Sequence, residues 1–170
     1  STICDLRESV LEQVKQKYQV PQATTNYEEV LRDPRIDAVL IATQAESHVP
    51  LTLQALNAGK HVYCEKPMAG SYADALAMYE AMLETGKKLH IQLSTLYQLE
   101  TKAAKRMIDQ GRLGGLYHLR SYGWRRRGRP FVDGYATKEF VNKKTAGGGA
   151  LFDMGVYHIA QLLYLAGLPR

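Results

Sequence analysis

The chain contains 170 residues, of which 45% are hydrophobic and 23% are charged, and its formal net charge is +5. This composition is typical of a globular protein and excludes a disordered or fibrous chain. Its apolar runs are far shorter than the roughly 20 residues of a membrane-spanning helix. Residues 1–6 also lack the basic start and apolar stretch of a signal peptide. We therefore expect no membrane partner.

Part of the positive charge lies in a basic tract formed by Arg125, Arg126, Arg127 and Arg129. Such a tract fits an anionic ligand, but no helix-turn-helix, zinc-finger or RNA-binding pattern accompanies it. We expect no nucleic-acid partner and interpret the tract as a solvent-exposed loop.

The cysteines Cys4 and Cys64 each fall in a strand that we predict to be buried. A free thiol in such a place behaves as a small apolar residue. This usage favours a reducing compartment, and we expect a cytoplasmic protein.

Strand-like and helix-like patterns alternate through the first half of the chain. Strands are predicted at 2–5, 38–43, 60–64 and 89–93, and helices at 9–18, 27–32, 48–58 and 71–85. Gly59 and Gly86 suit left-handed helix ends. This alternation is typical of a parallel sheet with crossover helices. Residues 38–42 are continuously apolar, which predicts a central strand covered on both faces.

The pattern changes in the second half. A helix is predicted at 96–110, a strand with one exposed face at 116–124, a long connection to 145, and an amphipathic helix at 150–166 after Gly147-Gly148-Gly149. We therefore predict two domains, 1–95 and 96–170.

A doubly wound nucleotide-binding domain normally begins with a strand and a glycine-rich turn, and an acidic residue follows about 20 positions later. Asp5 occupies the place of that acid. The predicted fold is therefore an α/β, Rossmann-type parallel sheet that lacks its first strand and glycine-rich turn. We interpret the chain as an internal portion of a longer protein.

The most specific motif is Glu65-Lys66-Pro67, at the carboxyl end of the predicted strand 60–64. Ligands of open α/β sheets bind beyond these strand ends. Pro67 favours an extended backbone at Lys66, and Glu65 could orient the ammonium group. A lysine held in such a crevice can exchange a proton with a substrate hydroxyl. The alternative is a surface turn with a casual ion pair.

Residues 37–67, which end in Ala58-Gly59-Lys60-His61-Val62-Tyr63-Cys64-Glu65-Lys66-Pro67, and residues 147–155 resemble the Gfo/Idh/MocA oxidoreductase family. The resemblance implies an NAD(P)-binding Rossmann domain followed by an α/β domain with a mostly antiparallel sheet. It also implies a homo-oligomer that oxidises or reduces sugars, inositols or related alcohols. On this pattern Lys66 matches the catalytic lysine.

The second motif of the family supplies Asp153, and many members have a histidine four residues later. Here that position is Tyr157, as in the branch of glucose-fructose oxidoreductase and dihydrodiol dehydrogenase. Residues four apart share a helix face, so Asp153 and Tyr157 should face the site together. His158 should point about 100° away. It is a further catalytic candidate whose alternative role is structural.

The resemblance also suggests the cofactor contacts. Asp5 would bind the adenosine ribose and favour NAD, whereas Arg7 nearby would permit NADP. The alternative for Asp5 is a helix N-cap, although Ser9 suits that role better. The remaining predicted cofactor contacts are Thr43, Gln44, His48, Glu65 and Lys66. His48 is alternatively an ordinary residue of a first helical turn. No metal is expected.

Two functions are compatible with this pattern. The first is an enzyme that moves a hydride between nicotinamide and a hydroxyl-bearing carbon. The second is a non-catalytic regulator or sensor of the same superfamily that binds the dinucleotide. Because Lys66 and Asp153 are both present, the enzyme is favoured.

Overall fold

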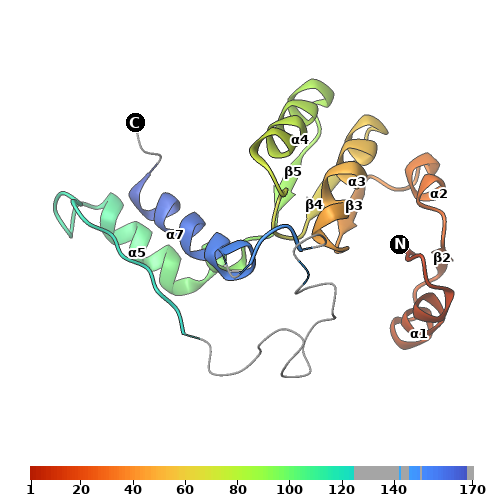
Figure 1. Cartoon of the computed structure of the whole chain (residues 1–170), viewed down its shortest axis with the longest axis horizontal. Helices are drawn as coiled ribbons and strands as arrows, with labels where there is room; N and C mark the ends of the chain where they lie inside the picture. The colour runs from red at the N-terminus through yellow and green to blue at the C-terminus, as the bar shows by residue number, and fades with distance from the viewer. Residues whose placement is uncertain (125–141, 143–145, 150, 168–170) are drawn as a thin grey trace.

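The computed structural model describes residues 1–124, 142, 146–149 and 151–167. Figure 1 shows the strands and helices following one another along the chain. The elements are β1 (Thr2–Cys4), α1 (Glu8–Tyr18), β2 (Gln22–Thr24), α2 (Tyr27–Arg32), β3 (Ala38–Ile41), α3 (Ala45–Asn57), β4 (His61–Cys64), α4 (Tyr72–Thr85), β5 (Leu89–Ile91), the 3-10 turn η1 (Ser94–Tyr97), α5 (Leu99–Asp109), the π-helical turn η3 (Leu151–Gly155) and α7 (Val156–Ala166). The predicted α/β alternation is confirmed, and the short strand β2 is an addition to it.

The strands form two parallel sheets. β1 pairs with β2, and β4 lies between β3 and β5. The register aligns Ile41 with Cys64, and Cys64 with Ile91. The carboxyl ends of β3, β4 and β5 therefore meet at one edge of their sheet, where ligands of this fold bind.

The prediction that residues 38–42 form a central strand covered on both faces is wrong. β3 is an edge strand of the three-stranded sheet. Its Ile41 is 3% exposed, whereas Leu40 on the opposite face is 67% exposed. The reason is that the helices contacting β3 and β4 pack on the Ile41 side, and residues that alternate along a strand point to opposite faces.

The core lies between this sheet and helices α3 and α4. Leu56 of α3, Met78 of α4 and Cys64 of β4 have no exposed surface. Burial of each large aliphatic side chain contributes roughly 1.5–3 kcal/mol. Helix α4 has Ser71 as its N-cap, whose hydroxyl accepts a hydrogen bond from the Asp74 N–H, and Gly86 as its C-cap, with φ of 64°. A non-glycine residue would be strained at that φ, so the predicted stop is confirmed.

Two predictions for the segment around β1 are wrong. Cys4 is exposed rather than buried. It is the last residue of β1, which pairs only with β2 in a two-stranded sheet of the described residues. Helix α1 begins at Glu8 with Arg7 at the N-cap position, so Ser9 lies inside the helix and does not cap it. The turn between Asp5 and Arg7, described below, starts the helix earlier than the sequence suggests.

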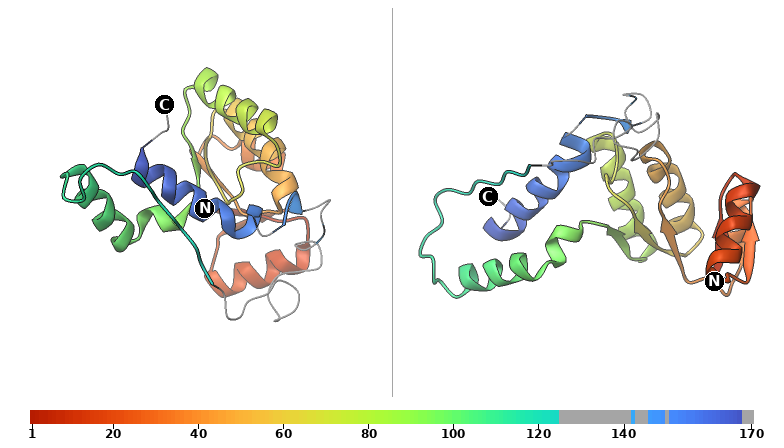
Figure 2. Two further views of the ribbon diagram at one scale, coloured as in Figure 1. Left: turned by 60° about the vertical axis from the view of Figure 1, so that its left-hand side comes forward. Right: turned by 90° about the horizontal axis from the view of Figure 1, so that it is seen from below.

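Helices α5 and α7 lie side by side at the end of the molecule away from α1 (Figure 2). The Gln161 amide donates to the Thr101 hydroxyl at 2.8 Å, and the Lys102 ammonium lies 5.2 Å from the Tyr164 ring centroid. The predicted strand at 116–124 is wrong. Those residues pair with no strand of the described part of the chain, and an alternating pattern forms a strand only where a partner supplies hydrogen bonds.

Candidate active site

The turn after β4 carries Lys66 into contact with the start of the second helical region. The Lys66 ammonium donates to the Asp153 carboxylate at 2.7 Å and to the Asp153 main-chain carbonyl at 2.9 Å. The two side chains are only 13% and 16% exposed. Asp153 lies in η3, directly before α7, and Figure 1 shows this segment in blue beside the β3–β4–β5 sheet. The peptide bond between Lys66 and Pro67 is cis.

Tyr157 completes a group of three side chains. Its ring centroid lies 5.5 Å from the Lys66 nitrogen, within the range of a cation–π contact. Asp153 and Tyr157 therefore approach the same ammonium group from one side of the helical segment. This is the arrangement that their four-residue spacing predicts.

His158 points elsewhere. Its Nδ1 lies 2.6 Å from the Ser121 hydroxyl, and a Cβ added at Gly123 would come within 2.9 Å of its ring. The side chain thus packs on residues 121–123. Its role as a further catalytic residue stays a prediction, and its position is the one expected for a residue turned aside.

Glu65 contacts Lys66 through the main chain. The Glu65 carboxylate accepts a hydrogen bond from the Lys66 N–H at 3.1 Å. This bond orients the turn that carries Lys66.

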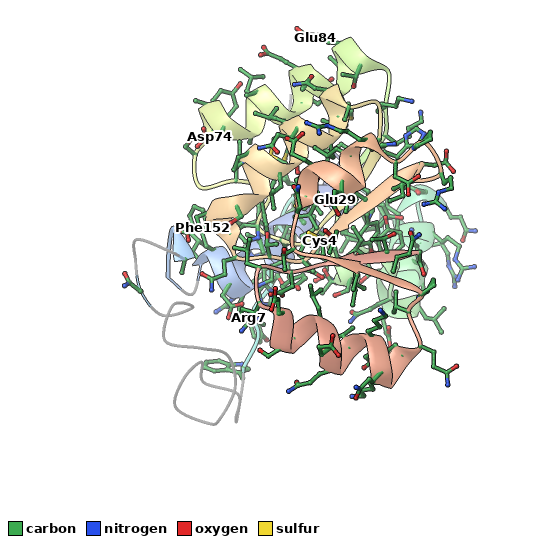
Figure 3. The ribbon with its side chains drawn as sticks, turned by 90° about the vertical axis from the view of Figure 1, so that its right-hand side faces the viewer. Cys4, Arg7, Glu29, Asp74, Glu84 and Phe152 are labelled. Carbon is green, nitrogen blue, oxygen red and sulfur yellow. The ribbon has the colours of Figure 1, made fainter. Side chains whose placement is uncertain are left out.

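Asp5 and Arg7 form a compact turn after β1. The Asp5 carboxylate accepts from the Arg7 main-chain N–H at 2.9 Å and from its guanidinium at 3.3 Å. The main-chain hydrogen bond is the larger cause that lowers the pKa of Asp5 below its ordinary value. Figure 3 shows Arg7 beside the first turn of α1. Asp5 is therefore a charged acceptor at the carboxyl end of β1.

The predicted cofactor residues after β3 differ in exposure. Thr43 and Gln44 are exposed in the turn between β3 and α3. His48 is only 1% exposed, and its Nδ1 and Nε2 lie 2.7 Å from the Pro67 carbonyl and 3.1 Å from the Thr43 carbonyl. The sequence indicated the first-turn position of His48 but not these two main-chain partners.

Sequence reasoning missed an aromatic group on the exposed face of the same sheet. Tyr63 and His90 stack with ring centroids 4.8 Å apart, and the Tyr97 ring lies 5.8 Å from His90. Together with Gln92 and Ser94 these residues line an open hollow of about 360 Å³. The register pairs Tyr63 with His90, so the signal was present in the alternation of β4 and β5 once their alignment is known.

The basic tract Arg125, Arg126, Arg127 and Arg129 lies outside the described residues. Within the described ranges, no helix has the length and apolar character needed to cross a membrane. The same part of the chain holds no cluster of three or more His, Cys, Asp or Glu side chains that could bind a metal ion.

Comparison with known proteins covers both halves of the chain. Residues 1–93 match the family described as "Oxidoreductase family, NAD-binding Rossmann fold", and residues 101–170 match the "GFO/IDH/MocA C-terminal domain". The D-glucoside 3-dehydrogenase of Escherichia coli is 30% identical over 98% of this chain and 46% of its own length. The trans-1,2-dihydrobenzene-1,2-diol dehydrogenase of Mus musculus is 31% identical over 94% of this chain and 45% of its own length.

Solved structures agree with these matches. An NAD-binding protein from Listeria innocua superposes with a TM-score of 0.82 and 32% identity over 98% of this chain and 47% of that one. The aldose-aldose oxidoreductase from Caulobacter crescentus, solved with glycerol, gives a TM-score of 0.79 and 27% identity over 98% and 49% of the two chains. The chain spans about half the length of these relatives. The two family matches and the relatives at 30% identity or more show that the chain belongs to the Gfo/Idh/MocA family of oxidoreductases, and the parallel α/β fold agrees with this.

Proposed function

We propose that this protein is an NAD(P)-dependent oxidoreductase that moves a hydride between nicotinamide and a hydroxyl-bearing carbon of a sugar, polyol or related alcohol. The observation that carries the proposal is the 2.7 Å contact between the Lys66 ammonium and the Asp153 carboxylate, with the Tyr157 ring 5.5 Å from the same nitrogen. The names of two relatives, a glucoside dehydrogenase and a diol dehydrogenase, support a hydroxylated substrate.

The three side chains divide the work on the proton. Oxidation of an alcohol carbon releases the hydroxyl proton, which a positioned group must accept. Lys66 and the Tyr157 hydroxyl are the groups that exchange this proton with the substrate. Asp153 holds the Lys66 nitrogen through two oxygens, so the lysine meets the substrate from a fixed position. The nicotinamide, when bound, accepts the hydride or supplies it in the reverse direction.

The side chains at the carboxyl ends of β1 and β3 fit a dinucleotide. The Asp5 carboxylate is charged at neutral pH, as any aspartate of ordinary or lowered pKa is, so it can accept hydrogen bonds from ribose hydroxyls and repel a 2′-phosphate. Thr43 and Gln44 offer exposed polar groups near the nicotinamide end. We therefore propose NAD as the cofactor. NADP is the alternative, because the Arg7 side chain is 73% exposed and can reach a phosphate.

The test of the activity is steady-state kinetics of the full-length protein with NAD and a panel of sugars and polyols. Lys66→Ala should lower kcat by about 10² to 10⁴-fold, the usual contribution of a general acid–base group. The matched control is Lys105→Ala, which breaks a Lys–Asp pair of α5 with Asp109. Turnover by Lys66→Ala at the wild-type rate would contradict the proposal.

The test of cofactor choice is Asp5→Ser. This change removes the charge that repels a 2′-phosphate, so kcat/KM with NADP should rise relative to kcat/KM with NAD. The two values are measured for wild type and variant. An unchanged ratio would mean that Asp5 only anchors the turn to Arg7. A cytoplasmic location and a homo-oligomeric state stay predictions of the sequence.

A further inference from the structure

His48 connects two turns that both follow strands of the three-stranded sheet. It lies in the first turns of α3 and is 1% exposed. One ring nitrogen is 2.7 Å from the carbonyl of Pro67, and the other is 3.1 Å from the carbonyl of Thr43. Thr43 follows β3, and Pro67 follows Lys66 after β4. The His48 side chain thus contacts the main chain of two turns, the one that contains Thr43, a predicted cofactor residue, and the one that contains Lys66.

The chemistry of these contacts is directional. Carbonyl oxygens only accept hydrogen bonds, so a hydrogen bond to either carbonyl requires a proton on the ring nitrogen that faces it. A neutral imidazole donates to one carbonyl, and a ring with protons on both nitrogens donates to both. In either form the ring donates to the main chain of a turn at the site. The shorter contact is the one to Pro67, the residue bonded to Lys66.

The strands themselves stop short of these turns. The Glu65 N–H donates to the Ile41 carbonyl at 2.8 Å, which extends the pairing of β3 and β4 to the first residue after β4. Lys66 and Pro67 lie beyond that bond. Beyond the Glu65–Ile41 hydrogen bond, His48 links the turn after β3 to the turn after β4 through its contacts with Thr43 and Pro67.

We propose that His48 is a positioning residue, which fixes the Lys66-Pro67 turn against the Thr43 turn and thereby sets the place of the Lys66 nitrogen. Its burial and its two main-chain partners favour this role over the direct cofactor contact predicted from the sequence. The effect on catalysis rests on the proposed function, whereas the effect on the two turns does not.

The experiment uses the full-length protein with two variants of His48 and one control. His48→Phe keeps a planar ring and removes both nitrogens. His48→Gln keeps a side-chain N–H that can donate to one carbonyl. The control is Leu56→Val, which removes packing from the same helix at a residue with no exposed surface and outside the two turns.

Hydrogen–deuterium exchange measures the two turns directly. In His48→Phe the amides of Ser47, Glu65 and Lys66, which donate hydrogen bonds within or next to the two turns, should exchange at least about tenfold faster, because the turns open more often. His48→Gln should restore part of the protection. Leu56→Val should leave these three amides close to wild type. Unchanged exchange at these amides in folded His48→Gln and His48→Phe would overturn the proposal. If His48→Phe fails to fold, His48→Gln alone decides, and faster exchange at these amides supports the proposal.

Kinetics then separate positioning from cofactor contact. A displacement of about 1 Å can cost up to about 10²-fold in rate, so His48→Gln should lower kcat at least about threefold with little change in the dissociation constant of NAD. A loss of NAD affinity with unchanged exchange and kcat would assign His48 to the cofactor and overturn the positioning role. If the wild type turns over no alcohol while the turns still open in His48→Phe, the proposed function fails and the positioning role stands.

Discussion

The two regions that build the site differ in how completely they bury their apolar residues. In the β3–α3–β4–α4–β5 unit, Leu56, Cys64 and Met78 have no exposed surface. In α7, whose sequence VYHIAQLLYLA is almost entirely apolar, no residue is buried. A helix this rich in apolar residues normally buries the apolar side chains of at least one face. The first region therefore has its own core, whereas α7 packs mainly on α5 and η1 within the described part of the chain.

The candidate site lies where the sheet region meets the helical region. Lys66 comes from the region that has fully buried core residues, and Asp153 and Tyr157 come from the helical region, where α7 has none. The place of Lys66 is therefore set by the sheet and by the turn that follows it. The place of its partners depends on the packing of η3 and α7.

The largest expected difference between the regions is in stability. Leu56→Ala should lower the free energy of unfolding by about 2–5 kcal/mol, because it leaves a cavity in a closed core. Ile159→Ala in α7 should cost less than about 1 kcal/mol, because Ile159 is 47% exposed. Urea denaturation of the chain measures both values. Equal costs would show that α7 is as tightly packed as the sheet.

A smaller effect is expected on catalysis in the full-length protein when residues of α7 near the Lys66 contact are replaced. Tyr157→Phe keeps the ring and removes the hydroxyl, so kcat should fall at least about tenfold if the hydroxyl exchanges a proton. His158→Ala should be milder, because His158 contacts Ser121 rather than Lys66. Steady-state kcat values decide. The reverse order would make His158 the partner of Lys66 and the helix register different in the working enzyme.

The smallest effect concerns a surface pair just before β3. Hydrogen bonds from the Arg35 guanidinium and main chain lower the pKa of Asp33 from its ordinary value of 3.8 to about 2. A lowered pKa means that the carboxylate stabilises the fold above pH 4 and that this contribution is lost as the pH falls from about 4 to about 2. Asp33→Asn should therefore lower Tm slightly at pH 7 and less at pH 2. A Tm difference that is the same at both pH values would mean that the charge of Asp33 contributes nothing.

The parts of the fold that were predictable are those fixed by local sequence. The apolar runs of β3 and β4 and the glycine at the end of α4 identify their elements without knowledge of the neighbours. β2 escaped prediction because Gln22–Thr24 is short and becomes a strand only by pairing with β1. The strand predicted at 116–124 does not form, because this segment pairs with no strand among the residues that the structure describes.

The site divides in the same way. Lys66 and Asp153 were chosen from the two family motifs, and their catalytic roles stay predictions. The approach of Asp153 and Tyr157 to the same Lys66 nitrogen was predictable, because four positions separate them along a helix. The role proposed for His48 was not, since its partners are two main-chain carbonyls that carry no sequence signature. The sheet register brings those carbonyls together, and register is a property of the folded chain.

The contact between Lys66 and Asp153 joins residues that are 87 positions apart. The entropic cost of closing a loop rises with its length, and contacts between sequence neighbours form before such long-range contacts. The pairing of β3 with β4 closes a far shorter loop. During refolding, the sheet should therefore form first and the lysine should meet its carboxylate late. Formation of the Lys66–Asp153 contact then reports that both helical and sheet regions have folded, because an intermediate with a finished sheet would present Lys66 without its partner.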